Sequence, residues 1–295
     1  MCLIWGIPYL LIRVAVRDLD PSVLVLGRTA IGALLLVPLA LWRGELRPVL
    51  PWWKPLLVFA AVEIAIPWVL LSSAERRLSS SFTGLTIAVV PLVGAVVTRE
   101  RLGAWSVGGL FLGLVGVAAL LGLDVGSLST IGVLEIGGVV LGYAIGPIVL
   151  SRQLRGLPSL GVIAASLGLT TIVYLPIAAF ELPTSPPPAK VVASVVALAV
   201  ICTALAFVVF FALIEEIGPV RATVITYVNP AVAAVLGVAI LGERFTTGMG
   251  VGFVLILVGS VLAARRPPES RPPAPGAGGP LRMKELATGV GSREG

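Results

Sequence analysis

The second half of this chain repeats the first, and the repeat restricts the folds that the chain can adopt. Pro91 and Pro230 lie 139 positions apart, each inside an apolar run that ends in a Glu-Arg pair. The same offset relates Pro8 to Pro147, Arg13 to Arg152, and the apolar block 58–65 to the block 197–204. A repeat of about half a chain has to be recognised before single elements are interpreted. We therefore expect two units of one design, in residues 1–123 and 131–264.

Beyond the two prolines the offset becomes 143, so the first copy lacks four residues, or about one helical turn. Two glycines in the last helix of each unit follow this second offset, Gly109 with Gly252 and Gly116 with Gly259. Gly113 lies between Gly109 and Gly116 on the same helix. Small residues at such spacing let two membrane helices approach closely. We expect these glycines to be packing positions.

Composition places both units in a membrane. Hydrophobic residues make up 57% of the chain and charged residues 12%, whereas soluble domains carry about 25% charged residues. Ten apolar runs follow one another, at residues 3–16, 22–42, 55–74, 82–98, 105–123, 131–150, 160–180, 191–214, 219–241 and 247–264. The sequence predicts an all-α polytopic membrane protein with ten transmembrane helices, five per repeat. Residues 265–295 are rich in Pro, Gly, Arg and Glu and lack an apolar period, which predicts a disordered cytoplasmic tail.

Lys and Arg residues near the helix ends predict the orientation. With both termini cytoplasmic, the inner connectors hold ten of these residues and the outer ones six, as the positive-inside rule favours. Five helices per unit is an odd number, so the second unit enters the membrane opposite to the first. Inverted repeats of this kind are typical of secondary transporters, whose substrate site lies near the midplane between the halves.

The first apolar run is short for a span of about 20 residues. It has no basic leader and no cleavage site, so we do not expect a removable signal peptide. A start codon upstream of the one used here would explain the short run.

Several short motifs resemble those of a known family. They are Leu3-Ile4-Trp5-Gly6, Arg28, and the two endings Pro91…Arg99-Glu100-Arg101-Leu102 and Asn229-Pro230…Gly242-Glu243-Arg244-Phe245. With these motifs, the chain resembles an EamA-type member of the drug/metabolite transporter superfamily over about residues 3–264. The resemblance implies a secondary active exporter or permease for small organic metabolites or drugs in the cytoplasmic (inner) membrane. It also implies that helices 1–4 and 6–9 line a central cavity, with helices 5 and 10 outside.

Glu63 is the first candidate for a functional group. It lies near the middle of the third run, about eight residues from either end, and is the only acid near mid-membrane by these helix limits. An isolated carboxylate there is costly and usually faces a cavity or a partner. Its repeat counterpart is Cys202, so the fold itself does not require the acid. We expect proton or substrate binding, and the alternative is a structural pair or a neutral, hydrogen-bonded acid.

Arg28 lies about six residues, or roughly 9 Å, inside the second run. In one interpretation it binds an anionic group or pairs with Glu63, and in the other it snorkels to the outer surface. Its repeat counterpart is Leu167, which is an asymmetry like that at Glu63. Arg13 and Arg152, by contrast, repeat and lie close to helix ends, where we expect interfacial anchors.

A further set of side chains could contact substrate: Trp5, Trp68, Tyr143, Tyr227 and Asn229. Aromatic faces and amides suit amphipathic or cationic ligands. Ordinary helix packing is the alternative for each of them.

Secondary transport is the leading class of function, with proton coupling left open. An enzyme is disfavoured because the chain has no histidine for a zinc-protease motif, no Gly-x-Ser-x-Gly elbow and no paired carboxylates on one helix face. The alternative function is a non-transporting membrane scaffold or sensor. It is disfavoured because such a role does not explain the large repeat or the buried charges.

The expected partners follow from the same residues. Basic side chains that stand singly between apolar runs are membrane-flanking charge and not a phosphate-binding patch. Cys2 and Cys202 form neither a metal-binding nor a disulfide pattern. We expect a small-molecule substrate and the lipid bilayer as partners, a homodimer as an open alternative, and no nucleic acid, cofactor or metal.

Overall fold

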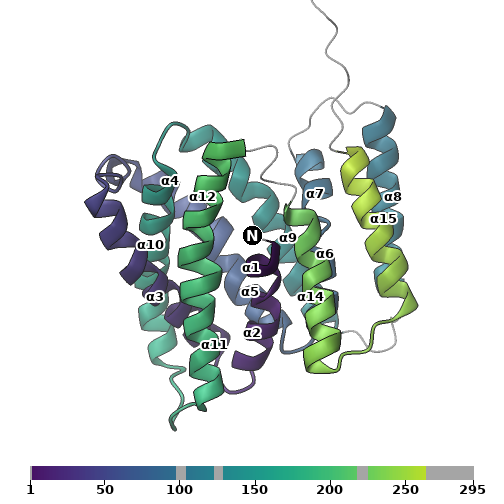
Figure 1. Ribbon diagram of the computed structural model, residues 1–295, viewed down its shortest axis with the longest axis horizontal. Helices are drawn as coiled ribbons and strands as arrows, with labels where there is room; N and C mark the ends of the chain where they lie inside the picture. Colours follow the sequence, from purple (N-terminus) through teal and green to yellow (C-terminus); the bar gives the residue numbers. More distant parts are fainter. Residues whose placement is uncertain (1, 98–103, 123–128, 218–224, 264–295) are drawn as a thin grey trace, which may run out of the picture. The chain divides into compact units, whose positions relative to one another are not determined.

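Helices occupy the predicted apolar runs in the part of the chain that the computed structural model describes, which comprises residues 2–97, 104–122, 129–217 and 225–263. No strand occurs among these residues. The first half contains α1 (Cys2–Gly6), α2 (Pro8–Ala15), α3 (Pro21–Trp42), η1 (Leu50–Trp52), α4 (Trp53–Phe59), η2 (Ala60–Ala65), α5 (Ile66–Ala74), α6 (Ser80–Ile87), α7 (Val90–Val97) and α8 (Ala104–Gly122). The second half contains α9 (Thr130–Gln153), α10 (Ser159–Ala179), α11 (Ala189–Ala199), η3 (Val200–Leu205), α12 (Ala206–Ile217), α14 (Ile225–Leu241) and α15 (Thr247–Ala263) (Figure 1). The predicted tail, residues 265–295, lies outside the described residues.

Five helical segments are long and apolar enough to cross a membrane. They are Pro21–Trp42, Leu50–Ala74, Thr130–Gln153, Ser159–Ala179 and Ala189–Leu213. The shorter apolar helices are Leu3–Ala15, Ser80–Gly94, Val107–Gly116, Asn229–Leu241 and Thr247–Gly259. Together these segments match the ten predicted runs one for one. The chain is therefore a multi-pass helical membrane protein, while the count of ten crossings stays a prediction.

Two of the predicted runs are divided in the structure, each close to a proline. The first run breaks between α1 and α2, where Pro8 begins the new helix. Proline suits this position because it lacks an N–H and its ring clashes with the preceding helical turn. The fourth run divides at Ala88 and Val89, whose N–H groups bond to carbonyls three residues back, before Pro91 in α7. A tighter turn thus separates α6 from α7.

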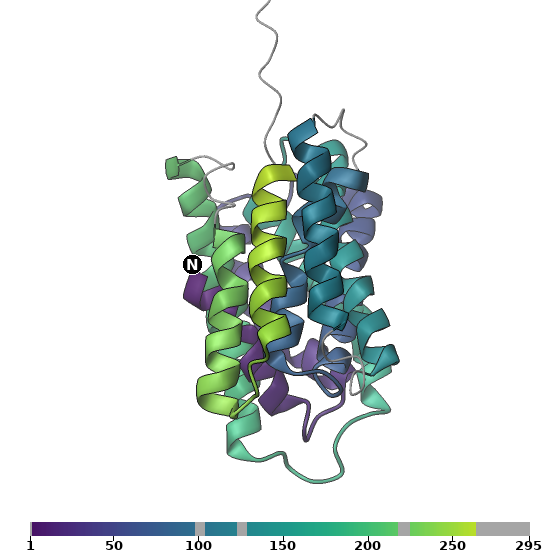
Figure 2. The same cartoon turned by 90° about the vertical axis from the view of Figure 1, so that its right-hand side faces the viewer.

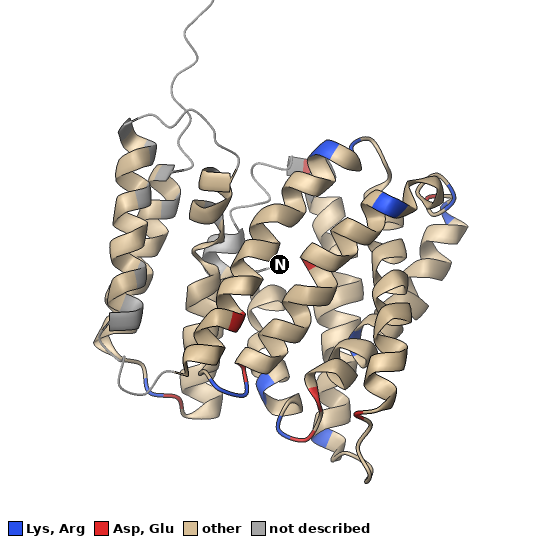
Figure 3. Cartoon of the chain, turned by 180° about the vertical axis from the view of Figure 1, so that it is seen from behind, with Lys and Arg blue, Asp and Glu red and all other residues tan. Residues whose placement is uncertain are grey.

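The outward surface of the helices is apolar, as a bilayer requires. Leu34, Phe111 and Leu134 expose 73%, 69% and 71% of their surface, which would be costly over a whole soluble molecule. In Figure 3 most of the helical length is free of charge, and many of the Lys, Arg, Asp and Glu residues stand near helix ends. Lipid tails cover such faces without an energetic penalty.

Helices α8 and α15 contact each other along their length and lie side by side in Figures 1 and 2. A Cβ atom at Gly259 would meet the backbone of Gly109 and Gly113 at 2.6 Å, and one at Gly116 would meet the backbone of Ile256 at 2.8 Å. The two backbones can approach this closely only because these positions lack a side chain. The prediction that these glycines serve helix packing is confirmed.

Candidate functional site

Both halves of the chain contain a π-helix inside their third predicted run. η2 and η3 each span six residues, and the N–H after each one bonds five residues back: Ile66 to Ala61 and Ala206 to Ile201. The two segments begin 140 residues apart, within one residue of the repeat offset. A π-turn is rare and often marks a functional site, because it widens the helix and leaves backbone groups available.

The neighbouring residues explain how these wide turns are tolerated. Pro67 follows η2 and has no N–H, so a backbone carbonyl before it loses its usual partner. The Tyr174 hydroxyl of α10 donates to the Ala65 carbonyl at 2.9 Å. In η3 the Thr203 hydroxyl donates to the Leu198 carbonyl, five residues back, at 2.8 Å. Each π-helix thus has a hydroxyl group bonded to a backbone carbonyl in or beside it.

Arg28 of α3 points into the protein and does not snorkel to the surface. Only 6% of the residue is exposed, and its guanidinium carbon lies 3.5 Å from the centroid of the Trp68 ring. Its Nε donates to the hydroxyl of Thr203 on η3 at 2.9 Å. Arg28 therefore connects α3, α5 and the second π-helix, which brings together residues from both halves of the chain.

Arg28 has no carboxylate partner among the described residues. The two ion pairs found there join Arg76 to Asp20 and Arg77 to Glu135, both at partly exposed positions. A buried cation without a paired acid is costly, and the cation–π contact and one hydrogen bond offset only part of that cost. The described residues thus compensate the charge of the guanidinium only in part.

Glu63 lies on η2 and faces α9 rather than Arg28. A Cβ atom at Gly146 of α9 would collide with the Glu63 carboxylate. The Oε2 atom is fully buried and has no hydrogen-bond partner among the described residues. The pairing of Glu63 with Arg28 that the sequence left open is therefore not formed in this structure.

Two aromatic side chains lie in the same region. Trp68 is almost fully buried, and Tyr143 of α9 packs against both hydrophobic clusters of the core. Tyr143 is close enough to Glu63 and Arg28 to interact with both charges. Glu63, Arg28, Trp68 and Tyr143 thus form one group, which we call the central site.

Trp5 and the backbone of Asn229 lie elsewhere. Trp5 of α1 packs against Phe207 and Phe210 of α12, with ring centroids 6.1 Å and 4.7 Å away. The backbone carbonyl of Asn229 lies next to Gly6 in α1. The side chain of Tyr227 lies outside the described part of the chain.

Sequence reasoning missed Thr203 and the acid Glu75. Thr203 stands in an unremarked apolar stretch, and only its position one residue after the counterpart of Glu63 could have drawn notice. Glu75 precedes Arg76 and Arg77, and such a charged triplet looks like an exposed connector. The structure instead buries Glu75 completely.

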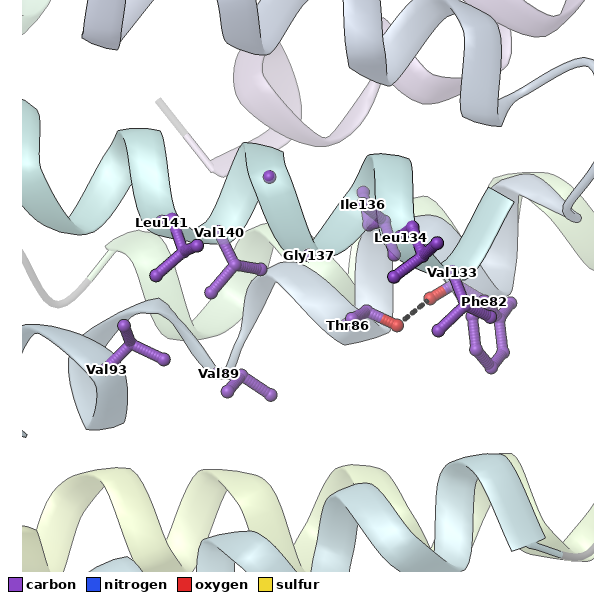
Figure 4. Close-up of a pocket in the computed structure, with 11 residues that line it drawn as sticks. Phe82, Thr86, Val89, Val93, Val133, Leu134, Ile136, Gly137, Val140 and Leu141 are labelled. Carbon is purple, nitrogen blue, oxygen red and sulfur yellow. Dashed lines mark hydrogen bonds between the residues drawn. The ribbon is translucent and has the colours of Figure 1, made fainter. Parts of the chain in front are cut away.

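A separate cavity of about 520 Å³ lies between α6, α7 and α9. Figure 4 shows its lining, which includes Phe82, Val93 and Leu141. The hydroxyl of Thr86 donates a hydrogen bond to the Phe82 carbonyl at 2.9 Å. The lining is therefore in effect apolar. The charged and hydrogen-bonding groups of the central site are not among these residues. No group of three or more potential metal ligands occurs among the described residues.

Buried ionisable residues in a multi-pass helical protein usually mark a substrate or ion pathway, and comparison with known proteins supports a membrane transporter. The model of the EamA-like transporter family matches residues 1–122 and again residues 130–265. The chain belongs to this family.

Two relatives match most of the chain. The uncharacterized transporter YvbV of Bacillus subtilis (strain 168) is 26% identical over 265 residues, which is 87% of each chain. The uncharacterized inner membrane transporter YedA of Escherichia coli (strain K12) is 28% identical over 283 residues, or 90% of each chain. A solved structure titled only "Crystal structure of protein" aligns with a TM-score of 0.64 at 22% identity, over 89% of this chain and 93% of that one. The solved structure supports the fold.

Proposed function

We propose that this protein is a secondary active transporter for small organic solutes that carry an anionic group, and that Arg28 binds that group. The observation that carries the proposal is a buried guanidinium with no carboxylate partner among the described residues. Ionisable residues inside membrane segments usually mark a substrate or ion pathway. A carboxylate on the substrate supplies the missing charge and accepts hydrogen bonds from the guanidinium fork.

The remaining residues of the central site favour an amphipathic solute. The Trp68 ring already stacks on Arg28, and Tyr143 adds a second aromatic side chain beside both charges. Aromatic walls with a few placed polar groups are typical of small-molecule sites. Glu63 offers a carboxylate for an amino group of the substrate or for a proton.

The proposed mechanism is alternating access by two inverted five-helix repeats, residues 1–123 and 131–264. Support comes from the two matches of the family model and from the two π-helices that begin 140 residues apart. The substrate would lie between the halves, near the midplane. With both termini cytoplasmic, as the Lys and Arg count favours, the net direction that we propose is export across the cytoplasmic membrane.

Transport by purified protein in liposomes tests this function. Uptake of labelled carboxylates and amino acids is compared with uptake of the corresponding uncharged amides, and an untargeted metabolite comparison of overexpressing and deletion strains supplies the candidates. The variant Arg28→Gln should lose uptake of the anionic solutes by about tenfold or more, because a charge-assisted hydrogen bond contributes about 1.5–3 kcal/mol.

The controls separate binding from folding. Arg28→Lys keeps the charge but not the planar fork, so it should retain part of the activity. Arg43→Gln changes an exposed arginine at the end of the same helix and should transport like the parent. Equal uptake by Arg28→Gln and the parent would remove Arg28 from the site, and a protein that moves no solute would contradict transport itself.

A further inference from the structure

The carboxylate of Glu243 binds the first turn of α6, far away in the sequence. Its Oε1 accepts from the Ser80 N–H at 2.7 Å, and its Oε2 accepts from the Ser81 N–H at 2.8 Å and the Ser81 hydroxyl at 2.7 Å. A carboxylate is well placed there because the free N–H groups and the helix dipole favour negative charge. This contact joins the α14–α15 connector of the second half to a helix of the first.

Glu75 lies beside this contact, directly after the span Leu50–Ala74. It has no exposed surface, and its Oε2 accepts from the Ser80 hydroxyl at 2.7 Å. Ser80 therefore contacts two carboxylates, one through its N–H and the other through its hydroxyl. The Glu75 Oε1 and the Thr83 Oγ1 are both buried and have no hydrogen-bond partner among the described residues.

The nearby cations do not neutralise Glu75. Arg13 of α2 donates through its Nη1 to the backbone carbonyls of Glu75 and Leu78, not to the carboxylate. Arg76 is paired with Asp20, and Arg77 is paired with Glu135. Among the described residues, the other titratable groups that face Glu75 are Tyr9 from α2 and Glu243 from the α14–α15 connector.

A proton on Oε1 of Glu75 removes a buried negative charge that no cation pairs with among the described residues. The new O–H can donate to the Thr83 hydroxyl, whereas in the ionised state that hydroxyl would be the donor. It also removes one of two negative charges that contact the same serine. The pKa of the Glu75 carboxyl is raised to about 8. Burial is the largest cause and the charge of Glu243 acts in the same direction, while Ser80, Arg13 and Thr83 lower the pKa.

We propose that Glu75 is a proton-binding site. While Glu75 is protonated, it holds closed the end of the helix bundle at which α5 ends, α6 begins and the α14–α15 connector lies. The proton sits between Oε1 and the Thr83 hydroxyl, and Glu243 stays bound to Ser80 and Ser81. When the end opens, water reaches the carboxyl, which gives its proton to a water molecule on that side and becomes hydrated. By linkage, a state that binds the proton more tightly is favoured as the proton concentration rises.

The role of this site in coupling rests on the proposed transport function, but proton binding itself does not. Infrared spectroscopy of the purified protein therefore tests it without a substrate. The parent should show the band of a protonated carboxylic acid that disappears with a midpoint near pH 8, the value expected for Glu75. The variant Glu75→Gln should lack this component. Glu135→Gln, which changes a nearby ion-paired acid, should keep it.

A neighbouring substitution distinguishes this site from Glu63, whose carboxylate also has a buried oxygen without a hydrogen-bond partner among the described residues. Thr83→Val removes the proposed acceptor of the Glu75 O–H and should shift the frequency of the band. Glu63→Gln should leave the band of Glu75 in place. A spectrum of Glu75→Gln identical to that of the parent would show that Glu75 is ionised, and the proposal would be wrong.

The closing of this end has its own measurement. A cysteine at Ala234, a buried position whose carbonyl accepts from Ser81, reports on access when Cys2 and Cys202 are replaced by alanine. Labelling by a water-soluble maleimide should be faster than in the matching Glu75→Gln protein above pH 8 and equal to it well below. A rate ratio that does not change with pH would overturn the coupling of proton and closure. A confirmed band in a protein that moves no solute would instead refute transport and leave the proton site standing.

Discussion

The carboxylate of Glu63 fills the place beside Gly146 where any larger residue would put its Cβ atom. The acid belongs to the π-helix η2 and the glycine to α9, so the contact joins the two halves of the chain. Position 146 must therefore be glycine for the Glu63 carboxylate to occupy this place, and not only for the helices to pack. The pair therefore offers a way to displace Glu63 without changing it.

Gly146→Ala should reduce transport because the added methyl group displaces the Glu63 carboxylate. Overpacking of this kind costs about 1–3 kcal/mol. The matched control is Gly137→Ala in the same helix, where a Cβ atom meets nothing within 4 Å and the helix gains about 1 kcal/mol in propensity. Thermal unfolding and liposome uptake are measured for both. Equal activity of the two variants would show that the position of Glu63 does not matter.

Glu63→Gln should fold and reach the membrane at the level of the parent but show a weaker pH dependence of solute accumulation, with the part due to Glu75 retained. The amide keeps the shape of the acid and removes the charge that titrates. Uptake over a pH series is the measurement, and Glu63→Asp should retain part of the dependence. A pH profile of Glu63→Gln that matches the parent would make the acid structural and leave Arg28 as the main residue of the site.

Gly259→Ala should destabilise the protein by about 1–3 kcal/mol. Its Cβ atom would meet backbone atoms of α8 at 2.6 Å, and backbone cannot move aside as a flexible side chain can. Gly108→Ala on α8, with nothing within 4 Å, is the control and should be neutral or stabilising. Thermal unfolding in detergent decides between them. An unchanged melting temperature for Gly259→Ala would mean that α8 and α15 can separate at little cost.

The stability of the protein should fall as the pH rises through about 8. The pKa of Glu75 is raised by burial from 4.5 to about 8, so its contribution is full below the ordinary pKa and is lost above the raised one. From about one unit below to about one unit above pH 8, the loss is on the order of 1 kcal/mol. Glu75→Gln should not show this loss in thermal unfolding. A parallel decline in both proteins would assign it to another group.

Composition and the repeat predicted the helices because a bilayer permits few alternatives for long apolar runs. The glycine positions of α8 and α15 were also predictable, since their spacing alone places them on one helix face. Arg28 shows where such reasoning ends. Its depth in the second run was plain, but its contact with Thr203 depends on how residues 175 positions apart pack.

The π-helices and the burial of Glu75 could not be foreseen for a related reason. Apart from Glu63, the residues of Ala60–Ala65 and of Val200–Leu205 are those of an ordinary apolar helix. The environment of Glu75 comes from Arg13, Ser80 and Glu243, which three different segments bring together. Local sequence gives no sign of such long-range neighbours.

In each π-helix the backbone hydrogen bonds run five residues back instead of four, so the turn contains about one residue more than an α-helical turn. Such a surplus residue can pass from one turn to the next while nearly all backbone hydrogen bonds are kept. The stretch that it crosses would then rotate by about 100°, the angle of one residue in an α-helix. For η2 this rotation would carry Glu63 away from Gly146, and for η3 it would carry Thr203 away from Arg28. A helix of this kind can present a different face to its neighbours without bending or unfolding.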